Sequence, residues 1–256
     1  MSTIFEELDW ARTPIGDVSL RRRQDPVTRE ILFEVLLGEE YLMSSKFTVA
    51  EIALARIALA RLAVGGAGGG GSPASEGSPG GGGTGLAVAV GGLGLGYTAQ
   101  RVLEDSRVRE LVVVELLRPV ISWHRQGLVP VGPTLTGDAR CRLIEGDFFA
   151  MSDGPGFDPE HPNREFDAVL LDIDHSPRHL LADGSAGFYG AEGTRRLASH
   201  IAEGGVYALW SNDPPDDAYL GILSEVFTDV AAEVVSFPNP LQGRDATNTV
   251  YLGTRA

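Results

Sequence analysis

The stretch VAVGGLGLGYTA, residues 88–99, joins an apolar run to a cluster of glycines and then to residues typical of a helix start. A strand that is buried on both faces reads as a continuous apolar run, and residues 86–90 (LAVAV) have this pattern. Gly92, Gly94 and Gly96 let the backbone pass close beneath a ligand. The stretch therefore predicts a strand–turn–helix unit that holds either a dinucleotide phosphate or the nucleoside S-adenosylmethionine.

Strands and helices alternate along the chain on both sides of this turn. Besides residues 86–90, the predicted strands are residues 111–115, 141–147, 166–172, 206–211, 232–237 and 248–253. The predicted helices between them are residues 97–105, 119–127, 193–205 and 218–227. This alternation predicts an α/β fold, a Rossmann-like doubly wound sheet of seven strands that binds ligands at the carboxyl ends of its strands. The last two strands are expected to form an antiparallel edge pair.

A glycine-rich tract divides the chain. Residues 65–85 contain 12 glycines in 21 residues, a composition that predicts a flexible linker. Residues 1–64 before it are expected to form a small β-hairpin or meander followed by one helix, with Thr48 as the N-cap and Glu51 completing a capping box. Residues 86–256 after it form the predicted ligand-binding domain.

Composition excludes several classes of function. A formal net charge of −14 argues against a nucleic-acid partner, because few counterions would be released from a phosphate backbone. Cys141 is the single cysteine, and the histidines lack the spacing of metal ligands, so no metal site is expected. No apolar run is long enough to span a membrane, and the first ten residues are unlike a signal peptide. We expect a cytoplasmic protein without membrane contact.

Acidic residues follow the predicted strands at the edge where the glycine turn lies. Glu115 ends the second strand of the domain, where a carboxylate can accept both hydroxyls of a ribose. Asp147 ends the third, where it can accept the exocyclic amine of adenine, and dinucleotide-binding folds make no such regular demand. Asp172 ends the fourth. Each acid alone could instead cap the following helix, but together with the glycine turn they favour the S-adenosyl nucleoside.

These residues resemble the class I S-adenosylmethionine-dependent transferases, and within them the spermidine synthase group of polyamine aminopropyltransferases. The similarity is carried by FDAVLLDIDHSP (residues 166–177) and by FYGAEGTRRLASHIAEGGVYALWS (residues 188–211). Members of this group place a β-hairpin unit before the nucleoside-binding domain, as predicted here. The resemblance covers most of residues 30–230 outside the linker.

The resemblance implies roles for particular residues. The glycines of the turn would lie beneath the methionine-like part of S-adenosylmethionine or its decarboxylated form, the co-substrate, while Glu115 would bind the ribose and Asp147 the adenine. Asp172 would activate an attacking amine by accepting its proton, and Asp174 and His175 add an acid and a base in the same loop. A small amine or another small nucleophile is the implied partner, and relatives of this type often form a homodimer through the N-terminal unit.

The acceptor site departs from the group's pattern. The turn carries Leu93 and Leu95 where the group has an acid, and His175 stands at the fourth place of the usual Asp-x-x-Asp. The group's Tyr-His-Glu at the helix entry is absent; residues 46–48 read Lys-Phe-Thr, with Glu51 later. The leading hypothesis is aminopropyl transfer from decarboxylated S-adenosylmethionine to an amine. The alternatives are a small-molecule methyltransferase, a non-catalytic nucleoside-binding or scaffold protein and, more distantly, an oxidoreductase.

Overall fold

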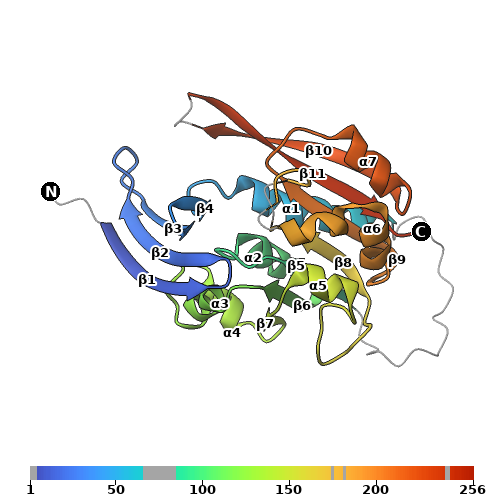
Figure 1. Cartoon of the computed structure of the whole chain (residues 1–256), viewed down its shortest axis with the longest axis horizontal. Coiled ribbons are helices and arrows are strands. Elements are labelled where there is room, and N and C mark those ends of the chain that lie inside the picture. Colours follow the sequence, from blue (N-terminus) through green and yellow to red (C-terminus); the bar gives the residue numbers. More distant parts are fainter. Residues whose placement is uncertain (1–4, 66–84, 174–175, 181–182, 240–242) are drawn as a thin grey trace.

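Figure 1 shows the chain as a computed structural model, in which a small N-terminal sheet stands beside a larger α/β unit. The structure describes residues 5–65, 85–173, 176–180, 183–239 and 243–256. Asp174 and His175, and all but the two ends of the glycine-rich tract, therefore lie outside the described residues. Within the described residues, no helix is both long enough and apolar enough to cross a membrane.

The larger unit is built on a seven-stranded sheet with the order β10-β11-β9-β8-β5-β6-β7. Strands β5 to β9 run parallel, and β11 is antiparallel to both β9 and β10. The strands are β5 Leu86–Gly91, β6 Val108–Glu115, β7 Cys141–Glu145, β8 Phe166–Leu171, β9 Ile201–Ser211, β10 Thr228–Asn239 and β11 Arg244–Thr254. The predicted doubly wound, seven-stranded sheet is confirmed, including its antiparallel pair, in which β10 is the edge strand.

Helices cover both faces of this sheet, because side chains alternate along the buried strands. In β5, Val88 and Val90 join a core cluster with α1 and α2, whereas Ala87 and Ala89 join a second cluster with α6 and α7. The elements besides α1 are α2 Tyr97–Leu103, α3 Arg118–Arg125, α4 Gly132–Gly137, α5 Phe148–Asp153, the 3₁₀ helix η1 Asp183–Tyr189, α6 Ala191–Ala198 and α7 Asp217–Ser224.

The N-terminal sheet is antiparallel and has the order β1-β2-β3-β4, with strands β1 Phe5–Thr13, β2 Gly16–Gln24, β3 Ile31–Leu37 and β4 Glu40–Ser44. Sequence patterning does not predict β1, because a register shift between Glu7 and Asp9 interrupts the alternation of a regular strand. The Trp123 indole of α3 donates a hydrogen bond of 2.7 Å to Asp9, which ties β1 to the larger unit.

Helix α1, Val49–Gly65, follows β4 and packs on the large sheet. Its Leu54 and Ala58 are fully buried in the same core cluster as Val88. Sequence analysis grouped this helix with the N-terminal strands, and in the structure it connects the two sheets. The Glu51 carbonyl lies 3.3 Å from the Thr98 hydroxyl, whereas the Leu59 carbonyl accepts a hydrogen bond from Arg107, which precedes β6. Side chains on the buried face of the first turns are therefore held at the carboxyl ends of the large sheet's strands.

Among the predicted helices, α6 departs most from its expected bounds. Helix α6 ends at Ala198 instead of continuing to residue 205, and β9 already begins at Ile201. The pairing of β8 with β9 shifts in register between Phe166 and Ala168, and the residues before Val206 form the irregular start of the strand. A local helical pattern is overridden here by pairing with a strand that is distant in the sequence.

Candidate active site

Backbone hydrogen bonds bring the carboxyl ends of neighbouring strands to one place. The Gly92 amide donates to the Val114 carbonyl at 2.9 Å, and the Asp172 amide donates to the Gly91 carbonyl at 2.8 Å. The turn after β5 is therefore fastened to the end of β6 on one side and to the residue after β8 on the other. This arrangement is the crevice at which open α/β sheets bind ligands.

The glycine turn depends on its lack of side chains. Gly92 has a φ angle of +92°, and a Cβ atom there would lie 2.1 Å from the Asp172 carbonyl oxygen. His124 of α3 is within 2.8 Å of the Gly94 carbonyl through its Nε2 atom, and burial lowers the pKa of this imidazole. A neutral His124 that donates its Nε2–H accounts for both observations and holds the turn in place.

Two cavities meet at this turn. The first, which we call the glycine-turn cavity, has a volume of about 360 Å³. Gly92, Gly94, Glu115, Asp147 and Asp172 line it, together with apolar side chains from β3, β4, α3 and α5. It is bounded by the ends of β5, β6 and β7, where sequence analysis expects the nucleoside.

Glu115 is buried at the base of the glycine-turn cavity. Its carboxylate accepts hydrogen bonds from the backbone amides of Leu93 at 3.0 Å and Leu117 at 2.8 Å. Burial raises the pKa of this carboxyl group, and the amide hydrogen bonds oppose the rise. Glu115 thus links the glycine turn to the end of β6, and this role in the turn is not evident from the sequence.

Asp147 caps a helix and also lines the glycine-turn cavity. One of its oxygens caps α5, accepting from the amides of Phe149 at 2.9 Å and Ala150 at 3.3 Å. The residue is exposed and also lines the glycine-turn cavity. A helix cap uses one carboxylate oxygen, and a carboxylate has two oxygens, each able to accept more than one hydrogen bond.

The second cavity, which we call the aromatic cavity, has a volume of about 350 Å³. Four aromatic side chains line it: Phe47, Tyr97, Trp210 and Phe237. They come from the β4–α1 connection, α2, β9 and β10, so both the N-terminal unit and the β10–β11 hairpin contribute. Asp172, Ile173, Gly94, Leu42 and Met43 line both cavities and form the boundary between them.

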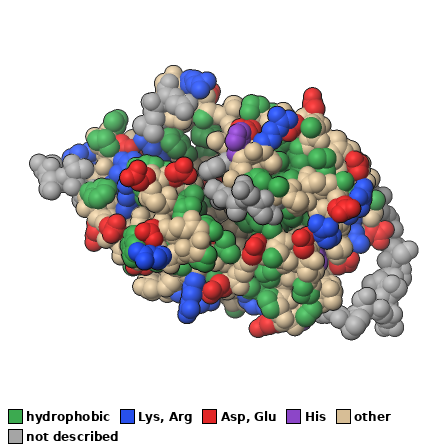
Figure 2. All heavy atoms as spheres, viewed as in Figure 1, with side chains coloured by type: hydrophobic (Ala, Val, Ile, Leu, Met, Phe, Trp, Pro, Cys, Tyr) green, Lys and Arg blue, Asp and Glu red, His purple; other side chains and the backbone are tan. Residues whose placement is uncertain are grey.

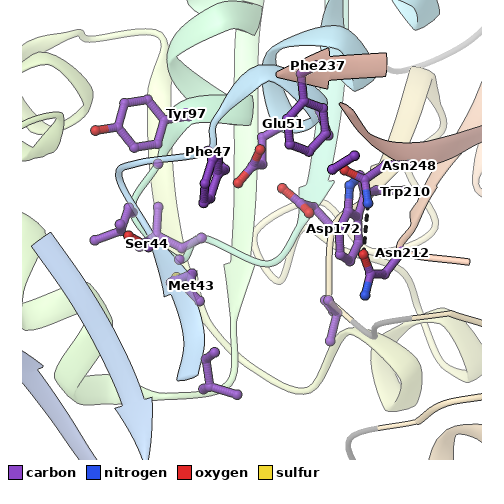
Figure 3. Close-up of a pocket in the computed structure, with 18 of the residues that line it drawn as sticks. Met43, Ser44, Phe47, Glu51, Tyr97, Asp172, Trp210, Asn212, Phe237 and Asn248 are labelled. Carbon is purple, nitrogen blue, oxygen red and sulfur yellow. Dashed lines mark hydrogen bonds between the residues drawn. The ribbon is translucent and has the colours of Figure 1, made fainter. Parts of the chain in front are cut away.

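A pair of carboxyl groups lies at this boundary. Figure 3 shows the carboxyl groups of Glu51, from α1, and Asp172 pointing toward each other. The Thr98 hydroxyl donates to Asp172 at 2.7 Å. Burial raises the pKa of Asp172 to about 6, and burial together with the neighbouring Asp172 raises the pKa of Glu51 to about 8. At neutral pH the pair therefore carries about one negative charge.

Glu51 is the site residue that sequence analysis did not identify. It was interpreted as half of a capping box with Thr48, whereas its side chain faces Asp172 and lines the aromatic cavity. A signal was present in the pattern: Leu54, Ala55 and Ala58 follow it at intervals of three, four and seven residues, and all are fully buried. An acid on the buried stripe of an apolar helix points to a specific partner.

The structure brings most of the predicted site residues together. Gly92, Gly94, Glu115, Asp147 and Asp172 line the glycine-turn cavity, and Gly96 lines the aromatic cavity beside it. The predicted Asp174 and His175 lie outside the described residues. The described residues that line the two cavities include five acids and neither lysine nor arginine. On the molecular face in Figure 2, by contrast, basic and acidic side chains are interspersed.

Three solved structures resemble this chain along nearly its whole length. Spermidine synthase from Thermotoga maritima matches with a TM-score of 0.65 and 16% sequence identity, covering 98% of this chain and 73% of that one. A spermidine synthase in complex with the transition state analogue AdoDATO matches with a TM-score of 0.64 and 15% identity, covering 98% and 72%. A probable spermidine synthase from Corynebacterium glutamicum ATCC 13032 matches with a TM-score of 0.60 and 16% identity, covering 99% and 81%.

Sequence comparison adds no closer relation. No protein-family model matches the chain, and no curated protein sequence matches it. At 15–16% identity the structural likeness concerns the fold. The chain has the fold of spermidine synthases, with an N-terminal antiparallel sheet and a seven-stranded mixed sheet.

Proposed function

We propose that this protein is a group transferase that moves an aminopropyl group from decarboxylated S-adenosylmethionine to an amine. One observation carries the proposal: the Asp172–Glu51 carboxyl pair lies at the boundary between the glycine-turn cavity and the aromatic cavity. A carboxylate between two cavities is suited to a reaction in which a nucleophile from one attacks a ligand held in the other.

The proposed reaction assigns each cavity a ligand. The nucleoside occupies the glycine-turn cavity, with its ribose toward Glu115 and its adenine toward Asp147, and the amine occupies the aromatic cavity. The amine nitrogen forms a bond to the carbon attached to the sulfonium sulfur, and the carbon–sulfur electron pair returns to sulfur as the thioether departs. Asp172 accepts the proton that the amine loses, for which a pKa near 6 is suited at neutral pH.

The charge of the cavity walls favours the decarboxylated ligand over S-adenosylmethionine itself. The two cavities are lined by Glu51, Glu115, Asp147 and Asp153 as well as Asp172, with no cationic side chain among the described lining residues. A ligand carboxylate in the glycine-turn cavity, among Glu115, Asp147 and Asp153, would be repelled, whereas the ammonium group of the decarboxylated ligand would be attracted. Methyl transfer from S-adenosylmethionine is therefore the less favoured reaction for this site.

The first test is calorimetric titration of the full chain with each ligand. We expect binding of decarboxylated S-adenosylmethionine at least tenfold tighter than that of S-adenosylmethionine. The reverse preference would assign the protein to methyl transfer, and binding of neither ligand would support a scaffold protein.

The second test is the Asp172→Asn variant, which keeps the shape of the side chain and removes its basicity. We expect its turnover with an amine acceptor to fall by about 100-fold or more, the usual contribution of a positioned base, with nucleoside affinity within about threefold of wild type. Asp229→Asn is the matched control, because Asp229 lines neither cavity and has a φ angle of +48°, which asparagine also tolerates. Wild-type turnover in Asp172→Asn would rule out Asp172 as the base.

A further inference from the structure

We infer that the acceptor is a small monoamine with an apolar body and an uncharged amide-like or hydroxyl group at its far end. This inference rests on the proposed function and names the substrate class that the aromatic cavity fits. It distinguishes the acceptor from a diamine, which carries a second ammonium group. Three properties of the cavity support it: the number of charged groups, the apolar side chains of its walls and the amide groups on the side formed by β9 and β11.

The cavity offers a single anionic centre. Glu51 and Asp172 are the charged side chains among its described lining residues, and they face each other. Because the pair carries about one negative charge at neutral pH, it balances one ammonium group. A second ammonium group elsewhere in the cavity would lose its hydration without gaining a counter-charge from the described walls.

Much of the remaining cavity wall is apolar. Phe47 and Phe237 approach with their ring centroids 6.0 Å apart, and Trp210 lies on the β9 side of the cavity. Met43 contributes a flexible apolar side chain at the boundary with the glycine-turn cavity. Such walls favour a hydrocarbon or aryl segment adjoining the amine.

Amide side chains line the cavity on the side formed by β9 and β11. Asn248 of β11 donates a hydrogen bond of 3.0 Å to Asn212, which follows β9, and Figure 3 shows this pair beside Trp210. Asn248 is only 5% exposed. An amide side chain has two donor hydrogens and an acceptor oxygen, so the pair has hydrogen-bonding capacity beyond its mutual bond. These groups match an uncharged amide or hydroxyl of the ligand, whereas they do not neutralise an ammonium group.

The size of the cavity limits the acceptor to a small molecule. Its volume of about 350 Å³ lies near the lower end of the range of roughly 300–1,000 Å³ that is usual for ligand pockets. The reaction itself is unchanged by the choice of acceptor: the carbon–nitrogen bond forms, the carbon–sulfur bond breaks, and the amine proton passes to Asp172.

The test compares acceptors of equal length that differ at one end. The full chain and decarboxylated S-adenosylmethionine are incubated with 4-aminobutanamide, 1,4-diaminobutane, 4-aminobutanoate or butan-1-amine, and release of the thioether nucleoside is measured. We expect kcat/KM for 4-aminobutanamide to exceed that of each of the other three at least tenfold, because a site built to hydrogen-bond a polar group discriminates against analogues that lack it. We further expect 4-(aminomethyl)benzamide to be accepted through its aryl ring.

Two substitutions of Asn248 test the role of the amide groups on the β9–β11 side of the cavity. Asn248→Asp adds an anionic group there and should shift the preference toward 1,4-diaminobutane at least tenfold. Asn248→Leu removes the amide and should reduce the preference for 4-aminobutanamide over butan-1-amine to within about threefold. Asn163→Asp is the control, since Asn163 lies outside both cavities. Titration with decarboxylated S-adenosylmethionine verifies that each variant retains a folded nucleoside site.

The outcomes separate this inference from the proposed function. Preference of the wild-type protein for 1,4-diaminobutane would overturn the inference and leave aminopropyl transfer in place. An unchanged acceptor preference in Asn248→Asp, with nucleoside binding retained, would also overturn it. Binding of the nucleoside without transfer to any of these amines would overturn the proposed function itself.

Discussion

At the scale of single residues, the main feature of the candidate site is a pair of neighbouring carboxyl groups with little access to solvent. Glu51 and Asp172 lie 121 positions apart in the sequence, and the packing of α1 on the large sheet brings them together. Ionising both would place two negative charges side by side in a poorly hydrated environment. The pair therefore keeps about one proton near neutral pH.

This arrangement predicts how stability changes with pH. The pKa of Glu51 is raised from 4.5 to about 8, so between these values the folded state binds a proton that the unfolded state has released. The contribution of Glu51 to the free energy of unfolding therefore falls as pH rises from about 4.5 to about 8, and is constant above. Urea unfolding of Glu51→Gln at pH 5, 7 and 9 should show a stability gain over wild type that grows with pH.

The difference between the two proteins isolates the Glu51–Asp172 pair from groups outside it, since these two carboxyl groups titrate together. The ion pair with Arg164 lowers the pKa of Glu110 to about 2, so Glu110 changes the free energy of unfolding only below about pH 4.5. His124 titrates identically in both proteins. A difference in the free energy of unfolding that is the same at all three pH values would contradict the raised pKa of Glu51.

At the scale of elements, the turn between β5 and α2 is the part of the site least tolerant of change. Gly92→Ala would combine a φ angle of +92° with a Cβ atom 2.1 Å from the Asp172 carbonyl oxygen. We expect it to lower the free energy of unfolding by about 3 kcal/mol and nucleoside affinity at least tenfold. Chemical denaturation and calorimetry measure the two effects.

A second glycine provides the matched control for this substitution. Gly221 lies inside α7, and a Cβ atom there would have no neighbour within 4 Å. Gly221→Ala should raise the free energy of unfolding by up to about 1 kcal/mol, since alanine favours a helix interior, and leave nucleoside affinity unchanged. Equal effects of the two substitutions would show that the turn after β5 has no special constraint.

At the scale of the whole molecule, the sequence predicts those features that depend on local pattern. The apolar run of residues 86–90 and the acids that end the next strands are local signals, and parallel strands necessarily collect their ends at one edge. Glu51 cannot be predicted as a site residue from local pattern, because its partner Asp172 follows a strand that is distant in the sequence. Strand β1 is not predicted, because a register shift interrupts its alternation at Glu7 to Asp9. The predicted length of α6 is too great, because the start of β9 pairs with β8.

The division of the chain by its glycine-rich tract leads to a prediction for the whole molecule. Residue 65 ends α1, residue 86 begins β5, and α1 packs against the large sheet. We therefore expect the intervening residues to act chiefly through the cost of closing a loop. That cost varies slowly with length, by about 0.6 kcal/mol for each doubling. Deletion of residues 70–79 roughly halves the tract, and we expect the free energy of unfolding to rise by about 0.6 kcal/mol or less.

Ligand binding provides the second measurement on the shortened chain. The tract contributes no described residue to the lining of either cavity, so affinity for decarboxylated S-adenosylmethionine should stay within about twofold of wild type. A variant in which residues 70–79 are replaced by ten glycine and serine residues controls for composition at constant length. If the deletion weakened nucleoside binding and the replacement did not, the tract would set the position of α1, and with it Glu51, against the site. If both changes weakened binding, particular residues of the tract would belong to the site, contrary to its interpretation as a linker.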